Sequence, residues 1–186
     1  MDLQIRRKAS KQMLYIAIIS MIMMFAGLTS AYIISSKRED WVSFSLPNAL
    51  YISTLLIVIS SVMYSLAQAS IKNNNKSKTT LFLFATLIFG VLFIIFQIVG
   101  FYQLKEAGLY FTGASSVVSS SLLVAISFAH ILHVLAGLIV LSVIISKHLS
   151  GKYSDKNYLG VELGGIFWHF VDVLWLALFL FFLIIT

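Results

Sequence analysis

The sequence predicts an all-α integral membrane protein, a bundle of five transmembrane helices. Hydrophobic residues make up 60% of the chain and charged residues 11%, whereas soluble domains average about 45–50% apolar and 25% charged residues. Five apolar stretches are each long enough to cross a bilayer, and the chain contains one Pro. A β-barrel would instead show segments of about ten residues that alternate in polarity.

The five helices are placed by the length of the apolar stretches. At about 20 residues per crossing, the expected spans cover residues 13–36, 48–71, 79–104, 118–146 and 159–185. The first stretch follows a basic segment, as in a signal peptide, but it exceeds the usual apolar region of about 7–15 residues and no small-x-small cleavage site follows. We therefore expect it to be retained, and residues 1–186 to form a single membrane domain.

The basic residues predict the orientation of the bundle. Ten of the 13 Lys and Arg residues lie before the first span, between the second and third spans, or between the fourth and fifth. These ten are Arg6, Arg7, Lys8, Lys11, Lys72, Lys76, Lys78, Lys147, Lys152 and Lys156. Under the positive-inside rule, this alternation predicts a cytoplasmic N-terminus and a C-terminus on the opposite, periplasmic side.

Composition also excludes several classes of function. The chain has no Cys, so disulfides, thiolate metal sites and cysteine nucleophiles are excluded. The net charge of +6 comes from basic residues spread over short loops, a distribution that does not favour nucleic acid as a partner.

Five ionisable residues fall inside the last two expected spans. His130 and His133 lie three residues apart on the fourth span, hence on one helix face. On the fifth span, Glu162, His169 and Asp172 follow spacings of seven and three residues, which place them on roughly one side of the helix. Ionisable groups in a membrane require protein partners, so we expect these five residues to form one internal polar network.

Small and large residues near this network predict close helix packing. Gly137 lies on the fourth span, and Gly164 and Gly165 lie on the fifth. Small residues of this kind let two membrane helices approach each other closely. Trp168 and Trp175, seven residues apart, are expected to pack in the same interface or to act as depth anchors.

Three interpretations of the polar residues remain open at this point. The first is structural: the side chains hydrogen-bond between helices or to a larger partner subunit. The second makes His130, His133 and His169 ligands of a haem or another metal; a haem would need His169 paired with His130 or His133, because two His one turn apart cannot take opposite axial positions. The third is a proton relay, as in a stand-alone proton-coupled carrier.

Several motifs resemble subunit III of the haem-copper oxidases. The last span contains WHFVDVLW at residues 168–175, with Glu162 seven residues before His169, and resembles the last helix of that subunit. FAHILHVLAG at residues 128–137 is similar to its preceding helix, and FAGLTSAY at residues 25–32 is similar to an earlier one. Phe96 and Gln97 resemble a polar spot on a middle helix, so the resemblance covers essentially the whole chain in order.

The resemblance implies a non-redox accessory subunit of a terminal respiratory oxidase. In that family the subunit packs on catalytic subunit I, stabilises it, supports proton uptake and binds phospholipid; the haem and copper lie in the partner catalytic subunit and none is expected in this chain. The shorter five-span form is typical of bacteria, which implies a multi-pass protein of the bacterial inner membrane. Cytochrome c and quinol both remain open as the electron donor.

Two family carboxylates are replaced in this sequence. The glutamate that usually precedes the position of Phe25 by four residues is Met21, and the acidic residue that usually follows the position of Gln97 by three residues is Gly100. The early helices therefore lack these two titrating groups. The resemblance supports the scaffolding role more strongly than the proton-uptake role.

Overall fold

The computed structural model describes residues 3–113, 116–153 and 158–186, and this part of the chain contains five long helices and no strand. All five are long and apolar enough to cross a membrane, which confirms the predicted all-α membrane bundle. The helices are α1 (Leu3–Ser35), α2 (Asn48–Lys72), α3 (Lys76–Glu106), α4 (Val118–Leu149) and α5 (Leu159–Ile185).

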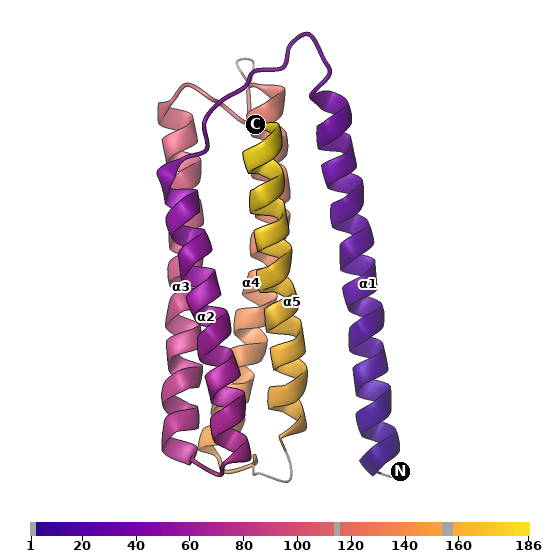
Figure 1. The fold of residues 1–186 in the computed structure, drawn as a ribbon, viewed down its shortest axis with the longest axis vertical. Coiled ribbons are helices and arrows are strands. Elements are labelled where there is room, and N and C mark those ends of the chain that lie inside the picture. Colours follow the sequence, from indigo (N-terminus) through magenta and orange to yellow (C-terminus); the bar gives the residue numbers. More distant parts are fainter. Residues whose placement is uncertain (1–2, 114–115, 154–157) are drawn as a thin grey trace.

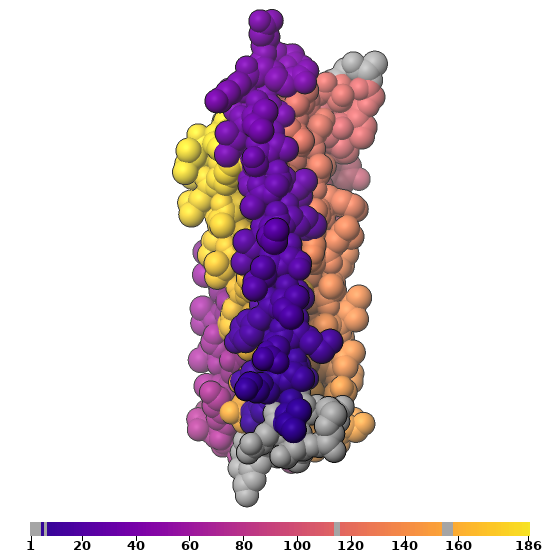
Figure 2. All heavy atoms as spheres, turned by 90° about the vertical axis from the view of Figure 1, so that its right-hand side faces the viewer, coloured from indigo at the N-terminus to yellow at the C-terminus, as the bar shows by residue number. Residues whose placement is uncertain are grey.

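Helices α2 to α5 form a four-helix bundle, and α1 packs on its outside. Within the bundle each helix contacts two neighbours, in the cyclic order α2, α3, α4, α5. Helix α1 contacts α4 and α5 (Figure 1). Figure 2 shows α1 running the length of the molecule over these two helices. The first turns of α1, the α2–α3 link, the end of α4 and the start of α5 lie at one end of the bundle, called here the basic end.

The first helix begins at Leu3, earlier than the predicted start at residue 13. The basic N-terminal segment consists largely of strong helix formers such as Arg, Lys, Gln and Ala, so the helix continues beyond the apolar stretch. This extension places Arg7 and Lys11 one turn apart on one helix face. Lys156, which contributed to the predicted orientation, lies outside the described residues, as does the side chain of Arg6.

A short link fixes α2 antiparallel to α3. Asn74 adopts the left-handed conformation, with φ of 54°, which Asn tolerates better than most residues. The side chain of Asn75 then accepts a hydrogen bond from the backbone N–H of Lys78 at 3.2 Å and so caps α3. The two adjacent residues thus end one helix and begin the next.

Trp168 fills the centre of the bundle because two helices have glycine opposite it. A Cβ atom at Gly90 on α3 would lie 2.9 Å from the indole ring, and one at Gly137 on α4 would lie 3.0 Å from it. Gly164 and Gly165 on α5 similarly face Ile144, Tyr64 and Gln68. These glycines allow the helices to approach closely at the level of a large aromatic ring.

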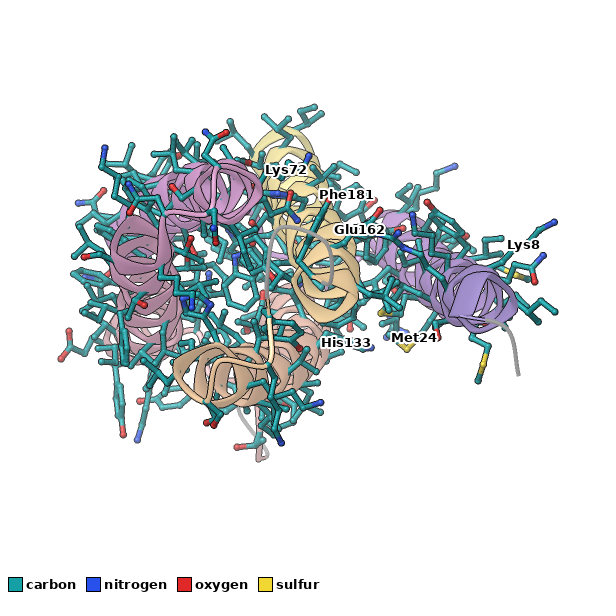
Figure 3. All side chains as sticks on the ribbon, turned by 90° about the horizontal axis from the view of Figure 1, so that it is seen from below. Lys8, Met24, Lys72, His133, Glu162 and Phe181 are labelled. Atoms are coloured by element: carbon teal, nitrogen blue, oxygen red, sulfur yellow. The ribbon has the colours of Figure 1, made fainter. Side chains whose placement is uncertain are left out.

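An ion cluster holds the N-terminal part of α1 against α5. Glu162, in the first turn of α5, accepts hydrogen bonds from Arg7 at 3.0 Å and from Lys11 at 2.5 Å. All three side chains are partly exposed, and Figure 3 shows Glu162 between α5 and α1. A carboxylate in this position is also favoured by the positive end of the helix dipole.

Two further contacts position α1 along its length. Near its middle, the Phe25 ring packs against the rings of His130 and His133 on α4, with centroids 6.3 and 5.6 Å apart. Near its C-terminal end, the Tyr32 hydroxyl hydrogen-bonds Thr186 at 3.2 Å. Helix α1 is therefore held at three levels, although most of its surface is exposed.

Substituting Gly137 tests the packing of Trp168. We expect Gly137→Val to lower the free energy of unfolding by about 1–3 kcal/mol, because the added methyl groups overlap the indole ring. Gly27→Val is the matched control, since a Cβ there meets nothing within 4 Å, and its effect should stay within about 0.5 kcal/mol. Thermal unfolding in detergent measures both, and equal effects would contradict the packing.

Neutralising Glu162 tests the ion cluster. We expect Glu162→Gln to lower the free energy of unfolding by about 1 kcal/mol, as for partly exposed ion pairs. Because salt screens such pairs, the loss should shrink as ionic strength rises. Asp40→Asn, which removes the exposed pair with Arg38 in the loop after α1, should change the unfolding temperature little. A loss for Glu162→Gln that does not depend on salt would count against the cluster.

Candidate functional site

The polar side chains inside the bundle are concentrated between α2 and α5. The indole N–H of Trp168 donates to the Ser60 hydroxyl at 3.2 Å, and that of Trp175 donates to the Thr54 hydroxyl at 3.0 Å. The two tryptophans are buried and lie two helical turns apart on α5. Both indoles therefore find their acceptors on the same neighbouring helix.

A second pair of contacts joins the same two helices closer to the basic end. The hydroxyl of Tyr64 and the side-chain amide of Gln68 donate to the backbone carbonyl of Val161, at 3.0 and 3.3 Å. Both donors come from α2, and the acceptor lies in the first turn of α5, where Gly165 leaves space for their side chains. The α2–α5 interface is thus hydrogen-bonded from Thr54 to Gln68.

Four polar residues form a continuous group that we call the α2–α5 seam, composed of Ser61, Ser65, His169 and Asp172. The two ring nitrogens of His169 contact the hydroxyls of Ser61 and Ser65, at 2.7 Å (Nδ1) and 3.3 Å (Nε2). Asp172 follows His169 by about one turn of α5, and its carboxyl group lies beside Ser61 of α2. Asp172 is 2% exposed, His169 is partly exposed and Ser65 is exposed, so the seam leads from the bundle interior to its surface.

The two histidines of α4 have different surroundings. His130 is fully buried, and its ring lies 5.1 Å from Trp175 and 5.9 Å from Phe93, measured between centroids. Among the residues that the structure describes, neither of its nitrogens has a hydrogen-bond partner. His133 is partly exposed, and its Nδ1 donates to the backbone carbonyl of Ala129 at 2.7 Å. Figure 3 shows His133 on the side of α4 that faces α1.

Gln97 is a further buried polar residue, on α3. Its side-chain amide donates to the Ser53 hydroxyl at 2.9 Å, and Ser53 donates in turn to the carbonyl of Leu50 on its own helix. Both polar side chains are fully buried. This contact links α3 to α2 in the same way that the tryptophans link α5 to α2.

The structure distributes the five predicted network residues over separate places. Glu162 pairs with α1, His130 lies among aromatic rings, His133 bonds its own helix, and His169 and Asp172 belong to the seam. In the described part of the chain, no hydrogen bond joins two of these five side chains directly; Ser61 is the shared neighbour of His169 and Asp172.

Sequence reasoning did not identify the partners on α2. These are Thr54, Ser60, Ser61, Tyr64, Ser65 and Gln68. A signal for them exists, because Thr54, Ser61, Ser65 and Gln68 follow spacings of seven, four and three residues and so share one helix face.

The geometry of the site is that of helix-to-helix hydrogen bonding. Within residues 3–113, 116–153 and 158–186, no group of three or more His, Asp or Glu side chains is arranged to hold a metal ion. Both nitrogens of His169 already contact serine hydroxyls, and the His130 ring is enclosed by side chains. The contacts of His169 connect α5 to α2, and those of the His130 ring connect α4 to α1, α3 and α5.

Comparison with known proteins identifies the family. The family model for cytochrome c oxidase subunit III matches residues 5–186. The chain is 36% identical over 129 residues to cytochrome c oxidase subunit 3 of Spodoptera frugiperda. The aligned residues are 69% of this chain and 84% of that protein. The Drosophila melanogaster protein of the same name is 37% identical over 129 residues. These residues are again 69% of this chain, but they are only 47%, about half, of the length of the Drosophila protein.

A bacterial relative matches more of the chain. Cytochrome c oxidase subunit 3 of the cyanobacterium Synechocystis sp. is 32% identical over 162 residues, which cover 84% of this chain and 67% of that protein. The family match therefore runs through all five helices, including the seam and the ion cluster. The chain belongs to the cytochrome c oxidase subunit III family.

Proposed function

We propose that this chain is a non-redox accessory subunit of a haem-copper terminal oxidase, held in the membrane against the catalytic subunit I of that complex. The observation that carries the proposal is the family match over residues 5–186. The complex would reduce oxygen to water with electrons from cytochrome c or a quinol, at haem and copper centres in the partner subunit. This chain would stabilise that partner.

The use of the buried polar groups supports a scaffolding role. The indoles of Trp168 and Trp175, the Tyr64 hydroxyl and the Gln68 amide all bond between α2 and α5. Hydrogen bonds of this kind fix one arrangement of helices in a membrane, where the lipid offers no alternative partner. A rigid bundle is what a supporting subunit has to present to its neighbour.

The position of Gly100 supports the same role. A Cβ atom there would lie 3.1 Å from the Leu50 side chain on α2, so α2 and α3 are in close contact at this level. A side chain at this position would require the Leu50 side chain on α2 to shift. In this chain Gly100 therefore serves helix packing. Because Met21 and Gly100 carry no titrating group, any role in proton uptake would depend on other residues.

We also propose that the basic end of the bundle faces the cytoplasm and that the C-terminus lies on the periplasmic side of a bacterial inner membrane. The basic end carries Lys72, Lys76 and Lys147, while in the loop after α1 at the other end Arg38 is neutralised by Asp40. The Arg38 guanidinium hydrogen-bonds both carboxylate oxygens, at 2.8 and 2.9 Å, and lowers the pKa of Asp40. This asymmetry supports the orientation under the positive-inside rule.

Purification in mild detergent tests the proposed function. We expect the tagged chain to co-purify with a larger haem-containing membrane subunit, and the assembly to consume oxygen with cytochrome c or a quinol as the electron donor. The chain expressed by itself should show no Soret band. A chain that purifies alone and binds haem in stoichiometric amount, or that moves protons across liposomes by itself, would contradict the proposal and favour a stand-alone cytochrome or carrier.

A further inference from the structure

The α2–α5 seam is a polar group on an otherwise apolar, membrane-facing surface. Ser65 is exposed and His169 is partly exposed, and they are bordered by the apolar side chains of Val62 on α2 (52% exposed) and Val173 on α5 (62% exposed). The outer face of α3 shows no such group along its middle, where Ile88, Val91 and Ile95 are exposed.

The seam lies near the centre of the hydrocarbon layer. His169 is ten residues from the start of α5, and Ser61 is eleven residues from the end of α2. At 1.5 Å per residue, both lie about 15–17 Å from the basic end of their helices, roughly half the thickness of a ~30 Å hydrocarbon core. Lipid tails at that depth offer no hydrogen-bond partner.

The seam retains hydrogen-bonding capacity after its internal contacts are made. The Ser65 hydroxyl is exposed, and a hydroxyl has one donor and two acceptor sites. Behind it, the Asp172 carboxyl group is buried beside Ser61, and within the described residues neither of its oxygens meets the geometric criteria of a hydrogen bond. Polar groups on a membrane helix typically face protein, because a second helix satisfies them and lipid does not.

We infer that the α2–α5 seam is a docking surface for a transmembrane helix of another oxidase subunit, which places a hydrogen-bonding group against Ser65 and His169. The inference rests on the proposed function, since it requires the chain to be part of an oxidase. The apolar side chains of Val62 and Val173 form the rim of the contact, and the hydroxyl and imidazole form its polar centre. The partner helix would separate the lipid from Ser65 and His169, and from the Asp172 carboxyl group behind them.

Photo-crosslinking in the intact oxidase tests which molecule covers the seam. A benzoylphenylalanine is placed at Val62 or Val173, and for comparison at Ile88 on α3, whose exposed fraction of 57% is similar. We expect both seam positions to give an adduct with another oxidase subunit, at a yield several times that at Ile88. If the chain co-purifies with the oxidase while Val62 and Val173 give only lipid adducts, the seam assignment is overturned and the proposed function stands. If no oxidase subunit co-purifies, the proposed function itself fails, and the docking surface with it.

A matched pair of serine substitutions tests the polar centre of the contact. Ser65→Leu is compared with Ser20→Leu on α1, because both serines are exposed and both donate to the carbonyl four residues earlier, at 3.2 and 3.1 Å. We expect Ser65→Leu to increase loss of the chain from the oxidase during detergent challenge by about three- to tenfold, and Ser20→Leu to leave it unchanged. Equal retention of both variants would overturn a hydrogen-bonded docking contact at Ser65.

Discussion

A polar side chain at the centre of a bilayer has to find its hydrogen-bond partner in protein, because hydrocarbon supplies none. In this chain the interface between α2 and α5 meets that requirement. Helix α5 supplies two indole N–H groups and an imidazole, and α2 supplies the hydroxyls of Thr54, Ser60 and Ser61 in register with them. These contacts fix both the rotation and the axial position of α5 against α2, and the other features of the fold depend on that placement.

The placement of α5 determines where α1 can bind. Glu162 lies at the start of α5 and faces outward, where Arg7 and Lys11 of α1 neutralise it. The Trp175 ring also packs against His130, and the His130 ring in turn packs against Phe25 of α1. Helix α1 is thus held by the ion cluster at Glu162, by the aromatic contact through His130, and by the contacts of Tyr32 with Thr186 and Phe182 at the C-terminal end of α5. These contacts explain how a helix with a mostly exposed surface keeps a defined place.

The sequence was sufficient to predict the five spans, because long apolar stretches and their flanking charges follow directly from bilayer thickness and electrostatics. It placed the start of the first helix too late, because the hydropathy pattern marks the apolar core of a helix and not its hydrogen-bonded ends. Gly90 also escaped prediction, since the feature that requires it, the ring of Trp168 on another helix, is distant in the sequence.

The candidate site was predictable by residue type but not by pairing. Histidine and aspartate inside a span signal buried polar contacts, and the structure places His169 and Asp172 beside Ser61. Taken singly, their serine partners carry little signal, because a membrane serine can bond its own helix backbone, as Ser65 also does. Only their shared face with Thr54 and Gln68 indicates them. Glu162 was grouped with His169 by a seven-residue spacing, which describes a helix face but not the depth at which each residue lies.

The central claim, that hydrogen bonds between α2 and α5 hold the bundle in one arrangement, is tested most directly by a double-mutant cycle on Trp175 and Thr54. Trp175→Phe removes the donor and Thr54→Val removes the acceptor of the 3.0 Å bond. The free energy of unfolding of the two single variants and the double variant is measured in mixed detergent micelles. The account predicts a coupling energy of about 0.6–1.7 kcal/mol, with the double variant less destabilised than the sum of the single ones. Strict additivity of the two substitutions would contradict it.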